Sequence, residues 1–259
     1  MNDFIKVRWV IGDHIITGCQ VGNGDILAIC FPGFSLSGEW MAKHYPDLYQ
    51  DKTCYFLNWP GLGDESLEKT PFELTKLKEW ILQIGASKNW LKKTIICHSF
   101  GARVVLKLLS ELPTFDELIM IAPVVKIRFW ENLIQNMPSI LYKNLINNYL
   151  KHNAINCILK IVQKIGLSNA GEKNFIQTHF ASKNMNLFLI HYALALPTLK
   201  LKRVDILNAL KSIQGIKIYL FNKDPFCDNQ FWQKIEPEIP NCSLIFVEGG
   251  HFKRIKNIQ

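Results

Sequence analysis

Apolar runs of strand length alternate with helical segments along the first half of this chain, and this alternation limits the folds open to it. Four such runs are "DILAICF", "KTCYFLNW", "KTIIC" and "DELIMIAPVV". Between them, "PFELTKLKEWILQIG" and "ARVVLKLLSEL" have the apolar spacing of a helix face. Earlier, two strand-type runs flank Gly12-Asp13, which predicts a hairpin. The pattern predicts an α/β fold with a mostly parallel central sheet and helices on both faces.

This alternation is interrupted once. From about residue 126 to residue 210 the pattern becomes helical, and strand-like runs resume with "IKIYLFNKD" and "CSLIFVEGG". We therefore expect a core formed by residues 1–125 and 206–259, with an inserted helical cap, or lid, at residues 126–205. The cap is expected over the carboxyl edge of the sheet, because open α/β sheets bind their ligands there.

Basic residues are concentrated in the expected cap. The net charge of the whole chain is +8, and the segment from Lys126 to Arg203 has eleven Lys and Arg against two acids, or +9. The rest of the chain therefore carries −1. A confined basic excess indicates an anionic partner or ligand at this segment, and solvated helix faces are the alternative interpretation.

Cysteine usage and hydropathy indicate the compartment. Seven cysteines are scattered along the chain without a C-x-x-C pair, so we expect reduced thiols in a cytoplasmic protein. No Cys and His spacing typical of a metal site occurs, and no metal or organic cofactor is expected. The longest apolar stretch is too short to cross a bilayer, and the first residues show no secretory signal core.

Ser99 lies where one predicted strand meets the next predicted helix. The segment from Cys97 to Gly101, "CHSFG", is close to the G-x-S-x-G nucleophile elbow, in which a strained turn lifts the serine oxygen above the sheet edge. Gly101 meets the need for a small residue two positions later, whereas Cys97 is larger than the usual glycine. An ordinary Ser-Gly turn is the alternative, and Cys97 as the nucleophile is a weaker one.

A serine needs a base to remove its proton and a carboxylate to orient that base. His251 follows the last predicted strand in "VEGGHFKR", and Asp224 follows the preceding strand in "YLFNKDPFCD". The chain order Ser…Asp…His is that of an α/β-hydrolase triad. Asp228 is the rival acid, but its position farther from the strand end favours Asp224. His98 is expected to point away from the serine.

An oxyanion formed by attack on a carbonyl needs preorganised N–H donors. The backbone N–H of Phe100 follows the nucleophile directly, and the loop "CFPGFSLSG" offers the N–H of Phe34. These two groups are the expected oxyanion hole.

Taken together, these motifs resemble those of the α/β-hydrolase superfamily along nearly the whole chain. "FPGFSLSG" resembles the oxyanion loop with Pro32 in place of the usual histidine, and "NWPGLGDES" resembles the D-x-P-G-x-G-x-S loop with Asn58 in place of the aspartate. A serine nucleophile argues against haloalkane dehalogenases and epoxide hydrolases. In size and layout the chain is most similar to small carboxylesterases with a helical cap. The basic cap resembles that of pimeloyl-[acyl-carrier protein] methyl ester esterases of biotin synthesis, which dock an acidic carrier protein.

This resemblance implies a serine carboxylesterase that acts through an acyl-enzyme. The substrate is expected to be a small acyl ester, attached to acyl carrier protein if the biotin resemblance holds; a nucleic acid partner is not expected. A type II-like acyl thioesterase, a non-catalytic binding protein on a hydrolase scaffold, and anionic membrane association are the alternatives. Apolar cap residues are expected to line the acyl pocket, namely Phe129, Trp130, Leu133 and Tyr142. Basic cap residues are candidates for carrier docking, namely Lys126, Arg128, Lys143, Lys151, Lys160 and Lys164.

Overall fold

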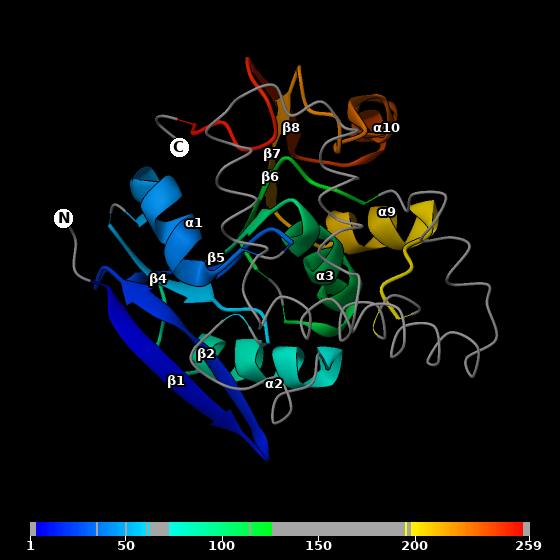
Figure 1. Cartoon of the computed structure of the whole chain (residues 1–259). Coiled ribbons are helices and arrows are strands. Elements are labelled where there is room, and N and C mark those ends of the chain that lie inside the picture. Colours follow the sequence, from blue (N-terminus) through cyan, green and yellow to red (C-terminus); the bar gives the residue numbers. More distant parts are fainter. Residues whose placement is uncertain are drawn as a thin grey trace, which may run out of the picture.

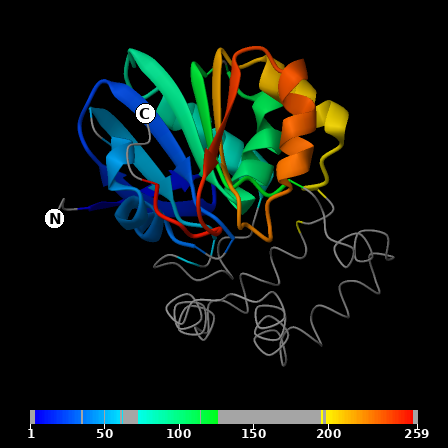
Figure 2. The same cartoon turned by 90° about the horizontal axis from the view of Figure 1, so that it is seen from above.

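An eight-stranded sheet forms the centre of the computed structural model (Figure 1). The structure describes residues 4–34, 36–49, 51–60, 62, 73–113, 115–125, 195 and 198–255. The strand order is β1-β2-β4-β3-β5-β6-β7-β8, and in Figure 2 the sheet runs from the blue hairpin of β1 and β2 to the red β8. The strands are β1 (Ile5–Ile11), β2 (His14–Val21), β3 (Ile26–Phe31), β4 (Lys52–Leu57), β5 (Lys92–His98), β6 (Glu117–Ile121), β7 (Gly215–Phe221) and β8 (Cys242–Val247).

The sheet is mostly parallel, as the sequence predicts. β1 and β2 form an antiparallel hairpin in which Ile11 pairs with His14, and Gly12 takes the left-handed turn position with φ of 62°. β2 also pairs antiparallel with β4, and all pairs from β4 to β8 are parallel. The carboxyl ends of six strands therefore lie along one edge.

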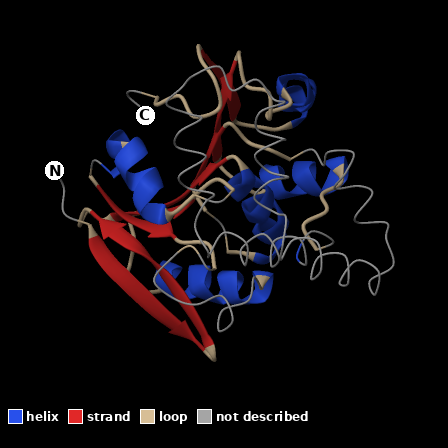
Figure 3. Cartoon of the chain, viewed as in Figure 1, coloured by secondary structure: helices blue, strands red, loops and turns tan. Residues whose placement is uncertain are grey.

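Helices cover both faces of the sheet, and each face has its own apolar core. Figure 3 shows the strands passing between α1 (Gly38–His44) and the group of α2 (Leu74–Gly85), α3 (Phe100–Leu108) and α9 (Arg203–Lys211). The larger core packs α2, α3, α9 and α10 (Asn229–Ile235) against the sheet, and its largest buried side chains include Trp59, Trp80 and Trp232. The smaller core packs α1 and the short helix η1 (Pro46–Tyr49) against the other face.

Three short 3₁₀ segments complete the described elements, and α9 lies at the expected cap boundary. η2 (Leu109–Glu111) extends α3, and η4 (Glu236–Glu238) extends α10. α9 packs on α3, and the expected boundary between residues 205 and 206 falls inside this helix. Nearly all of the expected cap, residues 126–194, lies outside the described residues.

The sequence did not predict α1, which spans only seven residues and begins with a glycine. Ser37 caps this helix, because its Oγ accepts a hydrogen bond from the Trp40 N–H at 3.1 Å. Gly38 starts the helix against β4, and a Cβ there would lie 2.5 Å from the Phe56 carbonyl oxygen. The same glycine that permits this contact made the segment resemble a loop in the sequence.

A buried carboxylate links three strands at the amino edge of the sheet. Glu117 of β6 is 9% exposed and accepts hydrogen bonds from Lys92 of β5 at 2.8 Å and from Lys217 of β7 at 3.0 Å. Burial raises the pKa of Glu117, but the hydrogen bonds from the two lysines outweigh burial and hold that pKa below its usual value. A carboxyl with a lowered pKa in the folded state adds stability above its unfolded pKa of about 4.3, and this contribution is lost as the pH falls through the folded value.

We therefore expect Glu117→Gln to lower the free energy of unfolding by about 1–3 kcal/mol at pH 7, because it leaves two lysines without their carboxylate. The loss shrinks at an acid pH below the lowered pKa of Glu117, where the native carboxyl is itself protonated. Urea denaturation at both pH values measures the difference. Glu111→Gln is the control, since Glu111 pairs with Lys78 at 2.9 Å on the surface, where ion pairs contribute little. An equal loss for Glu117→Gln at both pH values would contradict this assignment.

Candidate active site

Ser99 occupies a strained turn between β5 and α3. Its φ of 53° and ψ of −114° lie in a region that residues with a side chain rarely adopt. Hydrogen bonds to the neighbouring strand and its loop hold this turn: the Ser99 N–H donates to the Ile121 carbonyl at 2.8 Å, and the Ser99 carbonyl accepts from Val124 N–H at 3.2 Å. The serine is therefore fixed at the carboxyl edge of the sheet, at the corner that the sequence predicts.

The strand before Ser99 and the helix after it leave little space. A Cβ at Gly101 would lie 2.5 Å from the Phe31 carbonyl oxygen and 2.8 Å from that of Pro32, so only glycine fits there. The Cys97 side chain is fully buried, and its Sγ lies 3.7 Å from the Ile119 carbonyl oxygen. The structure therefore has room for a thiol at the position where the usual glycine has no side chain. Burial raises the pKa of the Cys97 thiol, so this group is a poor nucleophile.

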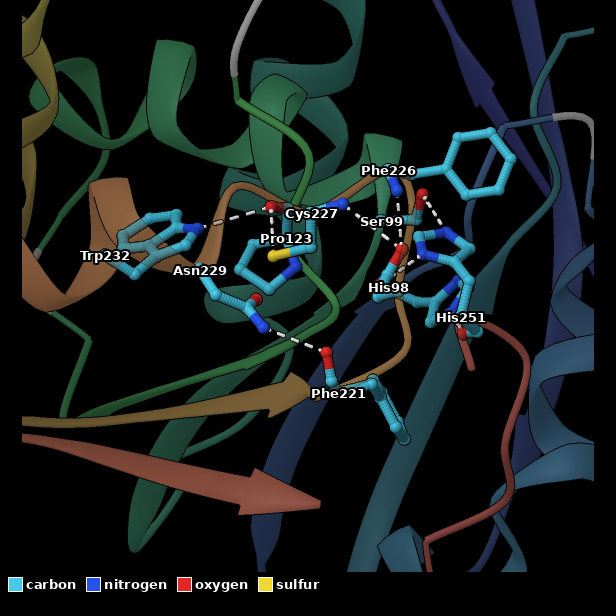
Figure 4. Close-up of polar contacts among 10 residues, drawn as sticks. His98, Ser99, Pro123, Phe221, Phe226, Cys227, Asn229, Trp232 and His251 are labelled. Atoms are coloured by element: carbon cyan, nitrogen blue, oxygen red, sulfur yellow. Dashed lines mark hydrogen bonds and ion pairs between the residues drawn. The ribbon is translucent and has the colours of Figure 1, made fainter. Parts of the chain in front are cut away.

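Three side chains from distant parts of the chain form a continuous line of hydrogen bonds. His251 Nδ1 lies 2.7 Å from Asp224 Oδ2, and His251 Nε2 lies 2.7 Å from Ser99 Oγ. Because a carboxylate only accepts, Nδ1 carries the proton of the neutral imidazole and Nε2 accepts from the serine hydroxyl. Figure 4 shows the Ser99 and His251 side chains facing each other. The structure thus brings together the three residues that the sequence singled out.

The Asp224 carboxylate is itself held in place. Its side chain is 0% exposed, and its Oδ1 accepts hydrogen bonds from the backbone N–H of Phe226 at 2.8 Å and of Cys227 at 3.1 Å. Oδ2 then remains directed at the imidazole of His251. The carboxylate is placed both to orient that ring and to stabilise a positive charge on it.

Asp228, the rival acid, has a different role. It caps α10, because its Oδ1 accepts a hydrogen bond from the Phe231 N–H at 3.0 Å. The two acids therefore differ in their partners: Asp224 binds the His251 imidazole, and Asp228 binds the first turn of a helix.

The loops that carry Asp224 and His251 are joined to each other. The Lys223 N–H donates to the Gly249 carbonyl at 3.0 Å, and the Gly249 N–H donates to Asn222 Oδ1 at 2.9 Å. Gly249 adopts a φ of 136°, which favours glycine. The glycine pair before His251 is thus used to turn the chain from β8 back toward Ser99.

The loop after β3 lies beside the elbow. The rings of Phe34 and Phe100 are perpendicular with centroids 5.8 Å apart, and Phe100 is the first residue of α3. Trp59, which the sequence did not identify, supports this loop through a hydrogen bond from Nε1 to the Gly33 carbonyl at 2.9 Å. The two segments expected to supply oxyanion donors are therefore neighbours, and the donor role of their N–H groups stays a prediction.

The sequence assigned no role to Phe226 or to Asn58. The Phe226 ring packs against the His251 imidazole at a centroid distance of 4.9 Å, and its only sequence signal is its position two residues after Asp224. Asn58, which departs from the usual aspartate of its loop, accepts a hydrogen bond from the Gly38 N–H at 2.7 Å. Asn58 therefore joins the end of β4 to the start of α1.

Other predicted site residues lie outside the described part of the chain. They are the pocket candidates Phe129, Trp130, Leu133 and Tyr142 and the docking candidates Lys126, Arg128, Lys143, Lys151, Lys160 and Lys164. Within the described ranges, no three His, Cys, Asp or Glu side chains are grouped as a metal site would need. None of the described helices has the length and apolar character that crossing a membrane requires.

Solved structures share this fold at low sequence identity. The thioesterase domain from the curacin biosynthetic pathway is 15% identical with a TM-score of 0.65, and the match covers 97% of this chain and 94% of that domain. A haloalkane dehalogenase from Bradyrhizobium elkani is 13% identical with a TM-score of 0.69, covering 96% and 92%. The 2-hydroxy-6-oxo-6-phenylhexa-2,4-dienoate hydrolase of a Rhodococcus strain is 13% identical with a TM-score of 0.66, covering 97% and 93%.

A search of curated proteins finds no match to this chain. The model of the alpha/beta hydrolase fold family, in contrast, matches residues 28–253, which is most of the sequence. The sheet order, the elbow at Ser99 and this match agree, and the chain belongs to the α/β hydrolase fold family.

Proposed function

We propose that this protein is a serine carboxylesterase in which Ser99 forms an acyl-enzyme. The α/β hydrolase fold supports hydrolase activity in general. The proposal of a serine esterase rests on one observation, the unbroken line of hydrogen bonds from Ser99 Oγ through His251 to the buried Asp224 carboxylate. Such a line makes a hydroxyl nucleophilic at neutral pH, and hydroxyl nucleophiles act on acyl carbonyls.

In the first half of the reaction, Ser99 Oγ attacks the ester carbonyl carbon while its proton moves to His251 Nε2. Asp224 stabilises the resulting imidazolium through the hydrogen bond at Nδ1. The tetrahedral intermediate places a negative oxygen near the elbow, where we expect the N–H groups of Phe34 and Phe100 to stabilise it. The alcohol then leaves with the proton from His251.

In the second half, water attacks the acyl-enzyme. His251 accepts the proton of the water, and the second tetrahedral intermediate expels Ser99 Oγ, which recovers that proton. The products are a carboxylic acid and the regenerated serine, so no redox partner or further reactant is needed. A haloalkane dehalogenase shares this fold. We do not propose halide displacement for this chain, because the side chain at the elbow is a hydroxyl and not a carboxylate.

For the substrate, we propose an acyl ester carried on an acidic carrier protein, with the methyl ester of pimeloyl-acyl carrier protein as the specific candidate. The charge of +9 confined to residues 126–203 supports an anionic partner. An acyl thioesterase is the second candidate, since the same three side chains can cleave a thioester and one similar structure is a thioesterase domain. Comparing a methyl ester with the thioester of the same acid separates the two candidates.

Ser99→Ala should abolish turnover of p-nitrophenyl esters, with a fall of at least about 10⁴-fold in kcat, because the buried Cys97 thiol at the elbow is a poor substitute for the hydroxyl. A fluorophosphonate probe should label the native protein and not the variant. Circular dichroism should show that the variant keeps its fold. Full activity in Ser99→Ala would contradict the mechanism, and an unreactive native protein would favour a non-catalytic scaffold.

The two acids give a matched pair of variants. Asp224→Asn should lower kcat by about 10⁴-fold, because an amide cannot hold the imidazole in the required tautomer or balance its charge. Asp228→Ala should leave kcat nearly unchanged and lower the free energy of unfolding by about 1 kcal/mol, because it removes a helix cap and not the partner of His251. Steady-state kinetics and urea denaturation test both variants, and the reverse pattern would assign the acid to Asp228.

Reversing the charge of Lys143, Lys151 and Lys160 together should raise KM for a carrier-bound ester and leave KM for a small free ester unchanged. Docking on a basic surface weakens with salt, so added salt should raise KM for the carrier-bound ester of the native protein in the same way. Equal effects on both substrates would count against a carrier. Liposome co-sedimentation that fades with salt would instead indicate an anionic membrane.

A further inference from the structure

Two imidazoles outside the Ser99–His251–Asp224 line hold the loop that carries His251. His44 Nε2 lies 2.9 Å from the carbonyl oxygen of Phe252, and His98 Nε2 lies 3.3 Å from the carbonyl oxygen of His251 itself. These contacts thus reach two consecutive peptide carbonyls from two different elements, the end of α1 and the end of β5.

Both imidazoles are uncharged donors at neutral pH. Burial lowers the pKa of His44, and burial together with the nearby His251 imidazole lowers the pKa of His98. A neutral imidazole has a single N–H, and a carbonyl oxygen can only accept. In both residues the proton is therefore on Nε2 and is donated to the loop.

His44 is itself held in a fixed orientation. The Trp40 ring stacks on its imidazole with centroids 4.4 Å apart and planes 13° from parallel. The Tyr45 ring lies perpendicular to the imidazole, with centroids 4.7 Å apart. Trp40 also meets the Phe252 ring edge-on at 6.3 Å. The donor and the residue that accepts from it are thus packed against the same indole.

The His251 loop has supports of different kinds on its two sides. On the side before His251, the backbone of Gly249 is bound to Asn222 and Lys223 of the β7 loop. After His251, the Lys253 N–H closes a local turn on the Gly250 carbonyl at 2.9 Å, a contact within the loop. The hydrogen bonds from His44 and His98 join this later part of the loop to α1 and β5.

We propose that His44 is a positioning residue for His251, which acts by fixing the Phe252 carbonyl. The proposal rests on the function proposed above, because His251 must keep its Nε2 on Ser99 Oγ and its Nδ1 on Asp224 at the same time. Rotation about the side-chain bonds cannot satisfy both contacts if the backbone after His251 moves. Without the His44 donor, the Phe252 carbonyl turns toward water and the imidazole leaves its alignment.

Three variants separate positioning from general stabilisation. His44→Phe keeps a flat ring against Trp40 and removes the N–H, whereas His44→Gln returns an amide N–H at similar reach. Thr53→Val is the matched control, because Thr53 Oγ1 donates to the Gly24 carbonyl at 2.7 Å from a buried position in β4 near the amino edge of the sheet. Thr53→Val thus removes a side-chain hydrogen bond to a carbonyl far from the elbow.

Ester kinetics are the first measurement. His44→Phe should lower kcat about tenfold or more, because small misplacements of a catalytic group are costly, and it should leave KM within about twofold. His44→Gln should recover most of kcat, and Thr53→Val should keep kcat while it loses stability to urea. Native kcat in His44→Phe, or an equal fall in Thr53→Val, would overturn the proposal.

Proton NMR is the second measurement and does not depend on turnover. The His251 Nδ1 proton, bound to the Asp224 carboxylate, should give a low-field resonance, assigned by its loss in Asp224→Ala. This resonance should be broadened or lost in His44→Phe and retained in His44→Gln and Thr53→Val. If the native protein cleaves no ester, the proposed function fails and the resonance alone decides on His44: its loss in His44→Phe supports positioning, and its persistence overturns it.

Discussion

The turn at Ser99 is the constraint on which the rest of the structure depends. A non-glycine residue with φ of 53° costs about 1–3 kcal/mol of backbone strain, and hydrogen bonds to Ile121 and Val124 hold it in place. The neighbouring Ala122 also has a positive φ, 48°, and its N–H is bound to the Tyr219 carbonyl. Backbone hydrogen bonds from β6, β7 and the loop after β6 thus hold both positive-φ residues, and they fix the hydroxyl at the edge of the sheet.

Parallel strands explain how residues so far apart in the chain meet. Ser99, Asp224 and His251 follow β5, β7 and β8, whose carboxyl ends lie at one edge because every pair from β5 to β8 is parallel. Each side chain then needs only a short loop to reach the centre of the site. The loops after β7 and β8 are hydrogen-bonded to each other through Gly249, and the loop after β8 is hydrogen-bonded to α1 through His44. The site therefore consists of loops that hold one another in place at the edge of the sheet.

Much of the fold follows from local sequence patterns. The eight strands, the hairpin at Gly12-Asp13 and the helices α2 and α3 agree with the sequence pattern, because short continuous apolar runs differ in length and spacing from the apolar face of a helix. α1 was missed because its glycine start, required by the contact with Phe56, imitates a loop. Among the site residues, Ser99, Asp224 and His251 were found because each combines a position after a strand with a side chain that triad chemistry needs. Trp59 and Phe226 follow strands but lack such a side chain, and His44 ends a helix.

The sequence by itself determined which side chains stand at strand ends, and their order, Ser…Asp…His, indicated the chemistry of the site. The sequence favoured Asp224 over Asp228 by its position nearer the strand end, but only the tertiary structure showed that Asp224 is bound to His251 and that Asp228 caps α10. The tertiary structure also decided the role of His44, whose partner lies 208 residues away. Local patterns record the conformation of neighbouring residues, whereas contacts across a sheet depend on how the elements pack, and no short stretch of sequence encodes that packing.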